Sequence, residues 1–370
     1  MSKVKLSEIG TFKNGLNFSA ERVLSGCKMI GVPDFGDNYL AKLDGLKEID
    51  EDIVSTDYLL QDNDILFVRS NGNKNLVGRA MLIEKIKEKV TFSGFCIRFR
   101  ITNNNVNPLY MLYLFKSPLF RKFFSNTQQT SISNLNQEIL GNIEVELPTI
   151  GQQNRIVKVI HGITRKIENN KRINDNLEQQ IKTIFTFQFL QSANTEWKQQ
   201  SLAELSEMYQ PKTISGKDLI VAGNYFVYGA NGIIGKYNQY NHSESEIAVA
   251  CRGASCGSIQ MTLPFSWITG NAMVVKPHSN FPYREYLYYY LLAKNPNYLC
   301  SGSAQPQLTR ENLTLYSLKV PSTTELNAFE SYAEKVRKII IKNQQENIEL
   351  STLRDWLLPV LMNGQATISD

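Results

Sequence analysis

The chain has 370 residues, 42% of them hydrophobic, which is enough for two domains that each bury a core. Its apolar runs fall well short of the roughly 18 residues of a membrane span, so we expect a soluble protein. Forty basic and 35 acidic residues give a net charge of +5, which permits nucleic-acid binding without requiring it.

The first residues and the cysteines indicate the compartment. Residues 1–10 carry charges and lack an apolar core, so we expect no secretory signal peptide and a cytoplasmic location. The five cysteines are odd in number and mostly scattered, which favours free thiols in a reducing environment. They are Cys27, Cys96, Cys251, Cys256 and Cys300.

Residues 1–148 are predicted to form a first β-rich domain. Apolar runs broken by Gly, Asn and Pro predict strands at 64–68 and 95–99, and residues 108–115 predict a helix. The strand at 64–68 is followed by Arg69 and a polar loop.

A first long helix is predicted at 149–190. Its seam residues recur at alternating steps of four and three, which is typical of a coiled coil, with an ordinary amphipathic core helix as the alternative. The seam consists of Ile156, Ile160, Ile163, Ile167, Asn170, Asn174, Leu177, Ile181 and Ile184.

The polar stretch 191–201 is predicted to be a linker, and residues 202–321 a second β-rich domain. Here strands are predicted at 246–250 and 272–275, and a helix at 282–292. The first of these strands is also followed by an arginine, Arg252, and a loop of small residues.

The second half of the chain repeats the first at an offset of 173 residues. Outside the helices, Leu135, Glu138, Leu140 and Pro148 recur as Leu308, Glu311, Leu313 and Pro321. A second long helix, predicted at 322–364, repeats the seam as Phe329, Ala333, Val336, Ile340, Asn343, Asn347, Leu350, Arg354 and Leu357. A shared offset across many identities indicates a duplicated module, a globular domain followed by a helix.

A duplicated chain that pairs its two helices is expected to be pseudo-two-fold, with the helices antiparallel. The expected fold class is therefore α+β: two β-rich domains separated by two long antiparallel coiled-coil helices. From Ile156 to Ile184 the helix spans about 42 Å at roughly 1.5 Å per residue. This is slightly more than one turn of B-DNA, about 34 to 36 Å, so two domains at this separation could recognise two half-sites on one duplex.

Asn170 and Asn343 lie halfway along their seams, and an antiparallel pair would bring the two amides face to face. A buried Asn costs stability but fixes register. We therefore predict that these two residues set the register of the helix pair.

The sequence offers no catalytic or metal-binding constellation. Residues 295–298 come close to an adenine methyltransferase motif, but no cofactor-binding loop accompanies them. The three histidines are isolated, and Cys251 with Cys256 lacks a second close ligand pair, so we expect no metal site. We expect a protein that is not an enzyme.

Several tracts resemble the specificity subunits of type I restriction–modification systems. Leu147–Pro148 with Gln152, Gln153 and Ile156 is similar to that family's entry into its first conserved helix. The tracts 226–235, 252–257 and 267–272 resemble its target-recognition domain, and residues 303–308 its turn before a short helix. The first domain departs further from the family pattern, which leaves its contact residues open.

The resemblance implies a non-catalytic subunit that binds a bipartite, asymmetric double-stranded DNA target, one half-site per domain. It implies two copies of an adenine methyltransferase subunit as partners, and restriction subunits that translocate and cut DNA. S-adenosylmethionine, ATP and Mg²⁺ are then expected on those partners, and no cofactor in this chain.

Candidate DNA contacts follow from the chemistry of base recognition. Arg pairs with guanine and Asn or Gln with adenine in the major groove, while small loops let the backbone approach phosphate. The candidates are Arg69, Ser70, Asn71, Asn73 and Lys74 in the first domain and Tyr228, Asn231, Arg252 and Ser255 in the second. The alternative is that the arginines are structural residues at strand ends and that the asparagines form turns.

A second functional class stays open at this point. The low net charge is also typical of a structural adaptor whose helices and domains bind proteins. The dependence of DNA affinity on salt separates the two classes, because a DNA-binding protein weakens steeply as salt rises.

Overall fold

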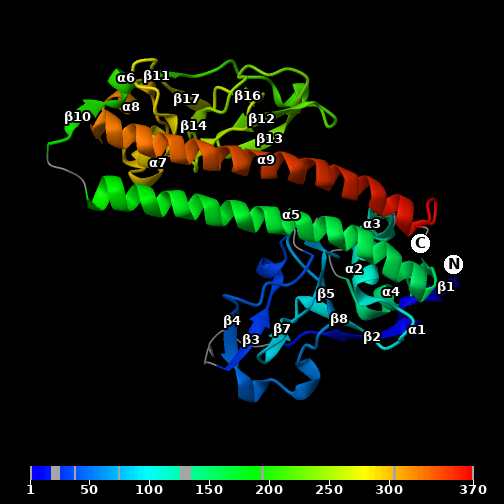
Figure 1. The fold of residues 1–370 in the computed structure, drawn as a ribbon. Coiled ribbons are helices and arrows are strands. Elements are labelled where there is room, and N and C mark those ends of the chain that lie inside the picture. The colour runs from blue at the N-terminus through cyan, green and yellow to red at the C-terminus, as the bar shows by residue number, and fades with distance from the viewer. Residues whose placement is uncertain are drawn as a thin grey trace. The chain divides into compact units, whose positions relative to one another are not determined.

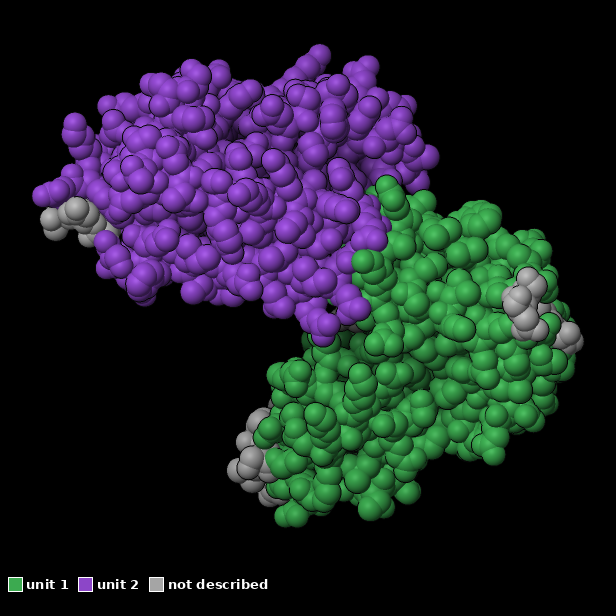
Figure 2. Space-filling model, in the orientation of Figure 1, with its two compact units in different colours: residues 1–168, 347–370 green, residues 169–346 purple. Residues whose placement is uncertain are grey.

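The computed structural model describes residues 2–17, 26–36, 39–73, 76–125, 135–192, 196–302 and 306–368. The chain divides into two compact units. Unit 1 comprises residues 1–168 and 347–370, and unit 2 comprises residues 169–346 (Figure 2). Each unit therefore combines one β-rich domain with a part of each long helix (Figure 1).

The strands found among the described residues of unit 1 form three sheets. The first pairs β1 (Ser2–Lys5) with β9 (Glu144–Leu147). The second has the order β2 (Gly10–Asn14), β8 (Cys96–Ile101), β5 (Ile65–Val68), β6 (Ala80–Leu82), all antiparallel. The third has the order β4 (Lys47–Asp50), β3 (Gly26–Ile30), β7 (Val90–Phe92), with β3 and β7 parallel.

Unit 2 repeats this topology. Its first sheet pairs β10 (Lys198–Ser201) with β18 (Ser317–Val320). Its second has the order β11 (Ser206–Tyr209), β17 (Ala272–Pro277), β14 (Ile247–Ala250), β15 (Ile259–Met261). Its third has the order β13 (Gly232–Tyr237), β12 (Tyr225–Gly229), β16 (Trp267–Ile268), again with one parallel pair, β12 and β16.

The short helices also occur in matching places. Those of unit 1 are α1 (Leu6–Ile9), α2 (Pro108–Lys116), α3 (Pro118–Ser125) and α4 (Gln137–Gly141). Those of unit 2 are α6 (Leu202–Leu205), α7 (Arg284–Ala293) and α8 (Arg310–Thr314), which match α1, α2 and α4, whereas α3 has no α-helical counterpart among the described residues of unit 2. Identical strand orders and matching helices confirm the predicted duplication and the α+β fold class.

One helix of each domain supplies the largest core side chains. In unit 1, Tyr110 and Phe115 of α2 are buried with Phe67 and Phe99 of the sheet. In unit 2, Tyr286 and Tyr289 of α7 pack with Phe185 and Phe329 of the long helices. Burial of the aromatic side chains is the main source of stability in both cores.

The long helices are α5 (Ile150–Phe185), which continues as a π-helical turn over Thr186–Gln191, and α9 (Thr323–Met362). Within unit 1, Ile156 and Ile160 of α5 share a core with Leu358 and Leu361 of α9. Within unit 2, residues near the end of α5 pack against the start of α9, as Phe185 does against Phe329. The helices are antiparallel in each unit.

The asparagine pairing differs from the prediction. Asn170 is buried and donates to Glu346 Oε2 at 2.7 Å, whereas Asn343 donates to Asn174 Oδ1 at 2.8 Å. The predicted face-to-face pairing of Asn170 with Asn343 is therefore wrong. The asparagines occupy only part of the seam. Large side chains elsewhere in it, such as Phe185 packed on Phe329, also constrain the register of the two helices.

Two further expectations need correction. The predicted linker 191–201 contains strand β10, whose backbone pairs with β18. Cys256 and Cys300 form a disulfide, while Cys27, Cys96 and Cys251 are free and buried. These features join segments far apart in the chain, 44 residues in the case of the disulfide, so local patterns could not reveal them.

Candidate nucleic-acid interface

The clearest candidate surface in unit 2 is the loop that joins β14 to β15. Arg252 follows the buried strand β14 and is exposed, and Ser255 is half-buried in the turn beyond it. Gly253 has a φ of +79°, a backbone conformation that glycine adopts without strain. The disulfide of Cys256 anchors the loop to the segment that follows helix α7.

The backbone of this loop is paired on its other side with residues 306–308. Arg252 lies opposite Gln307 in an isolated antiparallel bridge. Gly253 N donates to Pro306 O at 3.1 Å, and Leu308 N donates to Cys251 O at 2.9 Å. The position of Arg252 is therefore fixed by sheet-like hydrogen bonds although it lies outside the regular strands.

Arg69 and Arg252 do not occupy equivalent positions, although each follows a matching strand. Leu135 N donates to Arg69 O, as Leu308 N donates to Cys251 O, each at 2.9 Å. Arg69 therefore corresponds to Cys251, and Ser70 to Arg252. Successive residues of an extended segment point to opposite faces, so this displacement of one residue places the two arginines on opposite faces.

The surroundings of the two arginines agree with that difference. Arg69 is half-buried, and its guanidinium donates to Gly94 O at 3.4 Å. Arg252 is exposed, and the described part of the chain places no ion-pair or hydrogen-bond partner on its guanidinium. These surroundings favour a structural role at a strand end for Arg69. For Arg252 and Ser70 they agree with the prediction of a DNA contact.

The remaining first-domain candidates lie in the loop after β5. Asn71 is half-buried and accepts a hydrogen bond from Asn73 N at 2.7 Å, which is an Asx turn. Asn73 is exposed. Lys74 lies outside the described residues. Turn formation accounts for Asn71, and the DNA contacts of this loop stay a prediction.

Asn231 lies exposed in the tight turn between β12 and β13. Gln260 of β15 donates its amide to Gly229 O at 2.9 Å and so ties this turn to the strand that follows the Arg252 loop. The structure therefore brings Asn231 to the same part of unit 2 as Arg252 and Ser255.

Tyr228 is a core residue, which corrects its assignment as a DNA contact. It is 5% exposed and packs with Ile268 and Val274, and its hydroxyl accepts from Leu263 N at 3.0 Å. Burial raises its pKa above the ordinary value. Its neighbours Val227 and Gly229 are buried as well, so both faces of β12 are covered at this end of the strand.

An ionic cluster connects helix α7 to both long helices within unit 2. Buried Arg337 of α9 bonds Glu178 of α5, Glu285 Oε2 at 3.1 Å and Tyr289 Oη at 3.0 Å. Burial alone would lower the pKa of Arg337, but the negative charges of the Glu285 and Glu178 carboxylates hold it above its ordinary value. The cluster positions α7, and with it the sheet, on the helix pair.

Glu330 completes this connection at the N-terminus of α7. Its carboxylate accepts from the backbone N–H groups of Glu285 at 2.9 Å and Tyr286 at 3.1 Å. A helix N-terminus favours such a negative charge, yet burial dominates and raises the pKa of Glu330 to about 7.

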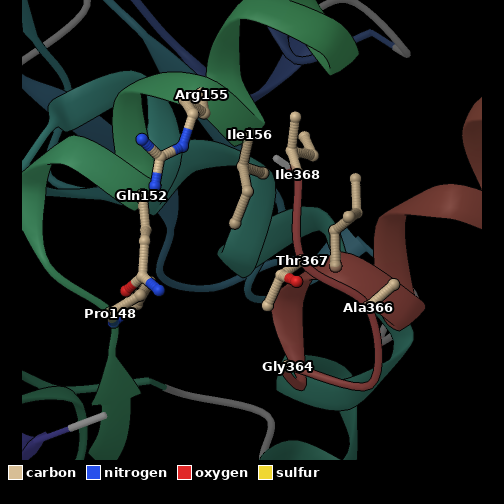
Figure 3. A pocket seen from close by; sticks show the side chains of 9 residues that line it. Pro148, Gln152, Arg155, Ile156, Gly364, Ala366, Thr367 and Ile368 are labelled. Atoms are coloured by element: carbon tan, nitrogen blue, oxygen red, sulfur yellow. The ribbon is translucent and has the colours of Figure 1, made fainter. Parts of the chain in front are cut away.

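Unit 1 contains a small cavity between the start of α5 and the segment after α9 (Figure 3). Its volume is about 80 Å³, and its walls include Pro148, Gln152, Ile156, Thr367 and Ile368. This cavity is smaller than a usual ligand pocket of about 300 to 1,000 Å³, whereas a more open hollow of unit 1, beside Asn103 and Gln153, measures about 660 Å³. Among the described residues there is also no group of three His, Cys, Asp or Glu side chains placed to hold a metal.

The described helices include none that is long and apolar enough to cross a membrane.

The fold and loops define a duplicated two-domain protein in which equivalent positions carry different polar side chains. A family model described as the type I restriction modification DNA specificity domain matches residues 1–179 and 194–351. The chain therefore belongs to this family, and it is a specificity subunit of a type I restriction–modification system.

Individual relatives agree with this assignment. The putative type I restriction enzyme MjaX specificity subunit of Methanocaldococcus jannaschii is 19% identical over 96% of this chain and 91% of its own length. The type I restriction enzyme EcoprrI specificity subunit of Escherichia coli is 31% identical over 34% of this chain and 32% of its own. The crystal structure of the S subunit from M. genitalium has the same fold, with a TM-score of 0.64 at 15% identity over 100% of this chain and 96% of that one.

Proposed function

We propose that the chain recognises a bipartite, asymmetric DNA target, one half-site with each β-rich domain. The observation that carries this proposal is the pair of equivalent positions Ser70 and Arg252. Two domains with one topology present different side chains at equivalent points of two equivalent sheets. Different side chains at one position specify different bases.

We further propose that the chain acts without catalysis and recruits an adenine methyltransferase, in two copies, and restriction subunits. S-adenosylmethionine, ATP and Mg²⁺ would bind those partners. The long helices carry exposed apolar side chains, Leu353 and Trp356 on α9 and Ile173 on α5, which suit partner contacts.

The decisive experiment combines the chain with an adenine methyltransferase subunit of a type I system from the same organism. The complex is given S-adenosylmethionine and a DNA library with randomised positions, and methylated adenines are located by sequencing. We expect two unrelated half-sites separated by a spacer of fixed length. Methylation at a single continuous motif, or none, would contradict the proposal.

Salt dependence tests DNA binding separately from methylation. The logarithm of the binding constant of the complex for its target should fall linearly with the logarithm of salt concentration, because phosphate contacts release counterions. The methyltransferase alone serves as the control. If this chain added no salt-dependent affinity, an adaptor role would replace the proposed one.

A further inference from the structure

Three separate segments form one polar row beside the Arg252 loop. Gln307 is the central member, with backbone partners on both sides. On one side it faces Arg252, with hydrogen bonds only from the flanking residues. On the other it faces Ser301, and the two residues exchange both backbone hydrogen bonds at 2.8 Å. Residues directly opposite one another in such pairs project to the same side.

The burial of neighbouring residues shows which side that is. Arg252, Gln307 and Ser301 are all exposed. Cys251 and Leu308, the residues next to them along the chain, are each 1% exposed and lie in the core of unit 2. The row is therefore the outer face of a small three-stranded ribbon, and its inner face is held by packing.

The spacing of the row suits a DNA groove. Opposite residues lie about 4.5 Å apart where the flanking residues make the hydrogen bonds, and about 5.5 Å apart where the pair itself makes them. The row therefore spans about 10 Å, whereas successive bases along a strand are about 3.4 Å apart. A ribbon of this width fits the major groove, which is about 12 Å wide.

The two longer side chains of the row, those of Arg252 and Gln307, are also free to bind, whereas the Ser301 hydroxyl donates to Gln307 O at 3.5 Å. Within the described residues, neither the Arg252 guanidinium nor the Gln307 amide has a side-chain hydrogen bond or ion pair. The loop itself is immobilised by its backbone pairing and by the Cys256–Cys300 disulfide. Because the backbone of the loop is already fixed, binding through the polar side-chain groups costs little additional backbone entropy.

We infer that Arg252, Gln307 and Ser301 form a base-recognition row, in which Gln307 is a specificity-determining residue that selects adenine in the second half-site. The Gln amide matches adenine N6 and N7 through two hydrogen bonds, and Arg252 matches guanine O6 and N7. Ser301 at the edge of the row has a hydroxyl for either base or phosphate. This inference rests on the proposed function of the chain.

The test compares Gln307→Ala with wild type in the full complex, using the same randomised library and methylation sequencing. We expect preference for adenine to fall roughly tenfold to a hundredfold at one position of one half-site, the size expected for a lost bidentate pair. Gln307→Glu should shift that position towards cytosine, because a carboxylate accepts from cytosine N4. Arg252→Ala should relax a neighbouring position of the same half-site.

The matched control is Gln344→Ala, which removes an exposed glutamine from helix α9. It should leave the motif unchanged, and thermal melting of each variant shows that it folds. An unchanged motif in Gln307→Ala would overturn the inference, as would uniform weakening at all sites or relaxation in the other half-site. A wild-type complex without any bipartite motif would instead reject the proposed function.

Discussion

At the scale of residues, the two arginines that follow matching strands lie in different surroundings, which predicts different roles for them. Arg69 is turned towards Gly94 and holds a loop of unit 1, whereas Arg252 faces outwards from unit 2. The difference arises from one residue of displacement in backbone pairing. Side-chain chemistry alone therefore does not identify a DNA contact, because the strand position decides where the side chain points.

Replacing each arginine by alanine should separate these tasks. Arg252→Ala should weaken binding of the complex to its target about tenfold to a hundredfold and relax the second half-site. Arg69→Ala should lower the free energy of unfolding by about 0.5–1.5 kcal/mol, the usual contribution of one hydrogen bond, and leave both half-sites intact. Fluorescence anisotropy and urea unfolding measure the two effects. A specificity change in Arg69→Ala alone would reverse the assignment.

Glu330 gives unit 2 a pH dependence whose sign follows from burial. Its pKa in the folded protein is about 7, above the ordinary 4.5. Between about pH 4.5 and 7 the folded state binds a proton on Glu330 that the unfolded state has lost. The contribution of this proton to stability is therefore fully present below about pH 4.5 and is lost as pH rises through 7. Glu330→Gln should remove this dependence.

The measurement is the difference in unfolding free energy between Glu330→Gln and wild type from pH 5 to 8. Relative to the variant, wild type should lose up to about 3 kcal/mol over this range. Comparing variant with wild type at each pH subtracts the other carboxylates, Glu285 included. A difference that stays constant with pH would contradict the assignment.

At the scale of elements, the α7 helix is held by charge as well as by packing. Arg337 joins Glu285 of α7 to Glu178 of α5, all within unit 2. Buried charges of this kind cost free energy to desolvate, so an intact cluster contributes little net stability. Removal of one partner leaves the others buried without a compensating charge, which is strongly destabilising. The cluster is thus better suited to fixing geometry than to strengthening the fold.

Arg337→Met should therefore destabilise the chain by about 3–5 kcal/mol, since buried Glu285 loses its hydrogen-bonded partner and keeps only Arg284, at 3.8 Å. Adding Glu285→Gln to this variant should recover part of the loss. Urea unfolding of the single and double variants gives the coupling between the two residues. Additive losses would show that the buried contact carries no coupling.

The elements were predicted better than their pairing. Apolar runs identified β5, β8, β14 and β17 and the helices α2 and α7, because burial and periodicity are local signals. The face on which Tyr228 lies, the relation of Arg69 to Cys251 and the role of Gln307 depend on partners distant in the chain. The pre-helix tract at residues 303–308 was the only signal that could have drawn attention to Gln307.

At the scale of the whole molecule, the repeat offset predicted the duplication but not the helix register. Asn343 pairs with Asn174, one turn along α5 from the expected Asn170. Asn174 in turn donates to Ile340 O at 3.2 Å. Polar pairs buried in a seam select one register against its alternatives, so Asn174 and Asn343 are now the residues predicted to fix it.

The double variant Asn174→Leu, Asn343→Leu should therefore keep or increase thermal stability while loosening the register. In the methylation assay, the fixed spacer should broaden into more than one length. Gln344→Ala on the same helix is the control. A single unchanged spacer in the double variant would show that other contacts hold the register.

Under the proposed function, the one-residue displacement between the two domains would affect how new targets arise. Insertion or deletion of a single codon beside β5 or β14 would exchange the outward and inward side chains while leaving the strand order in place. A domain could thus acquire a different outward side chain from residues it already encodes. A change in the recognised half-site would then result from a one-codon insertion or deletion as readily as from an amino-acid substitution.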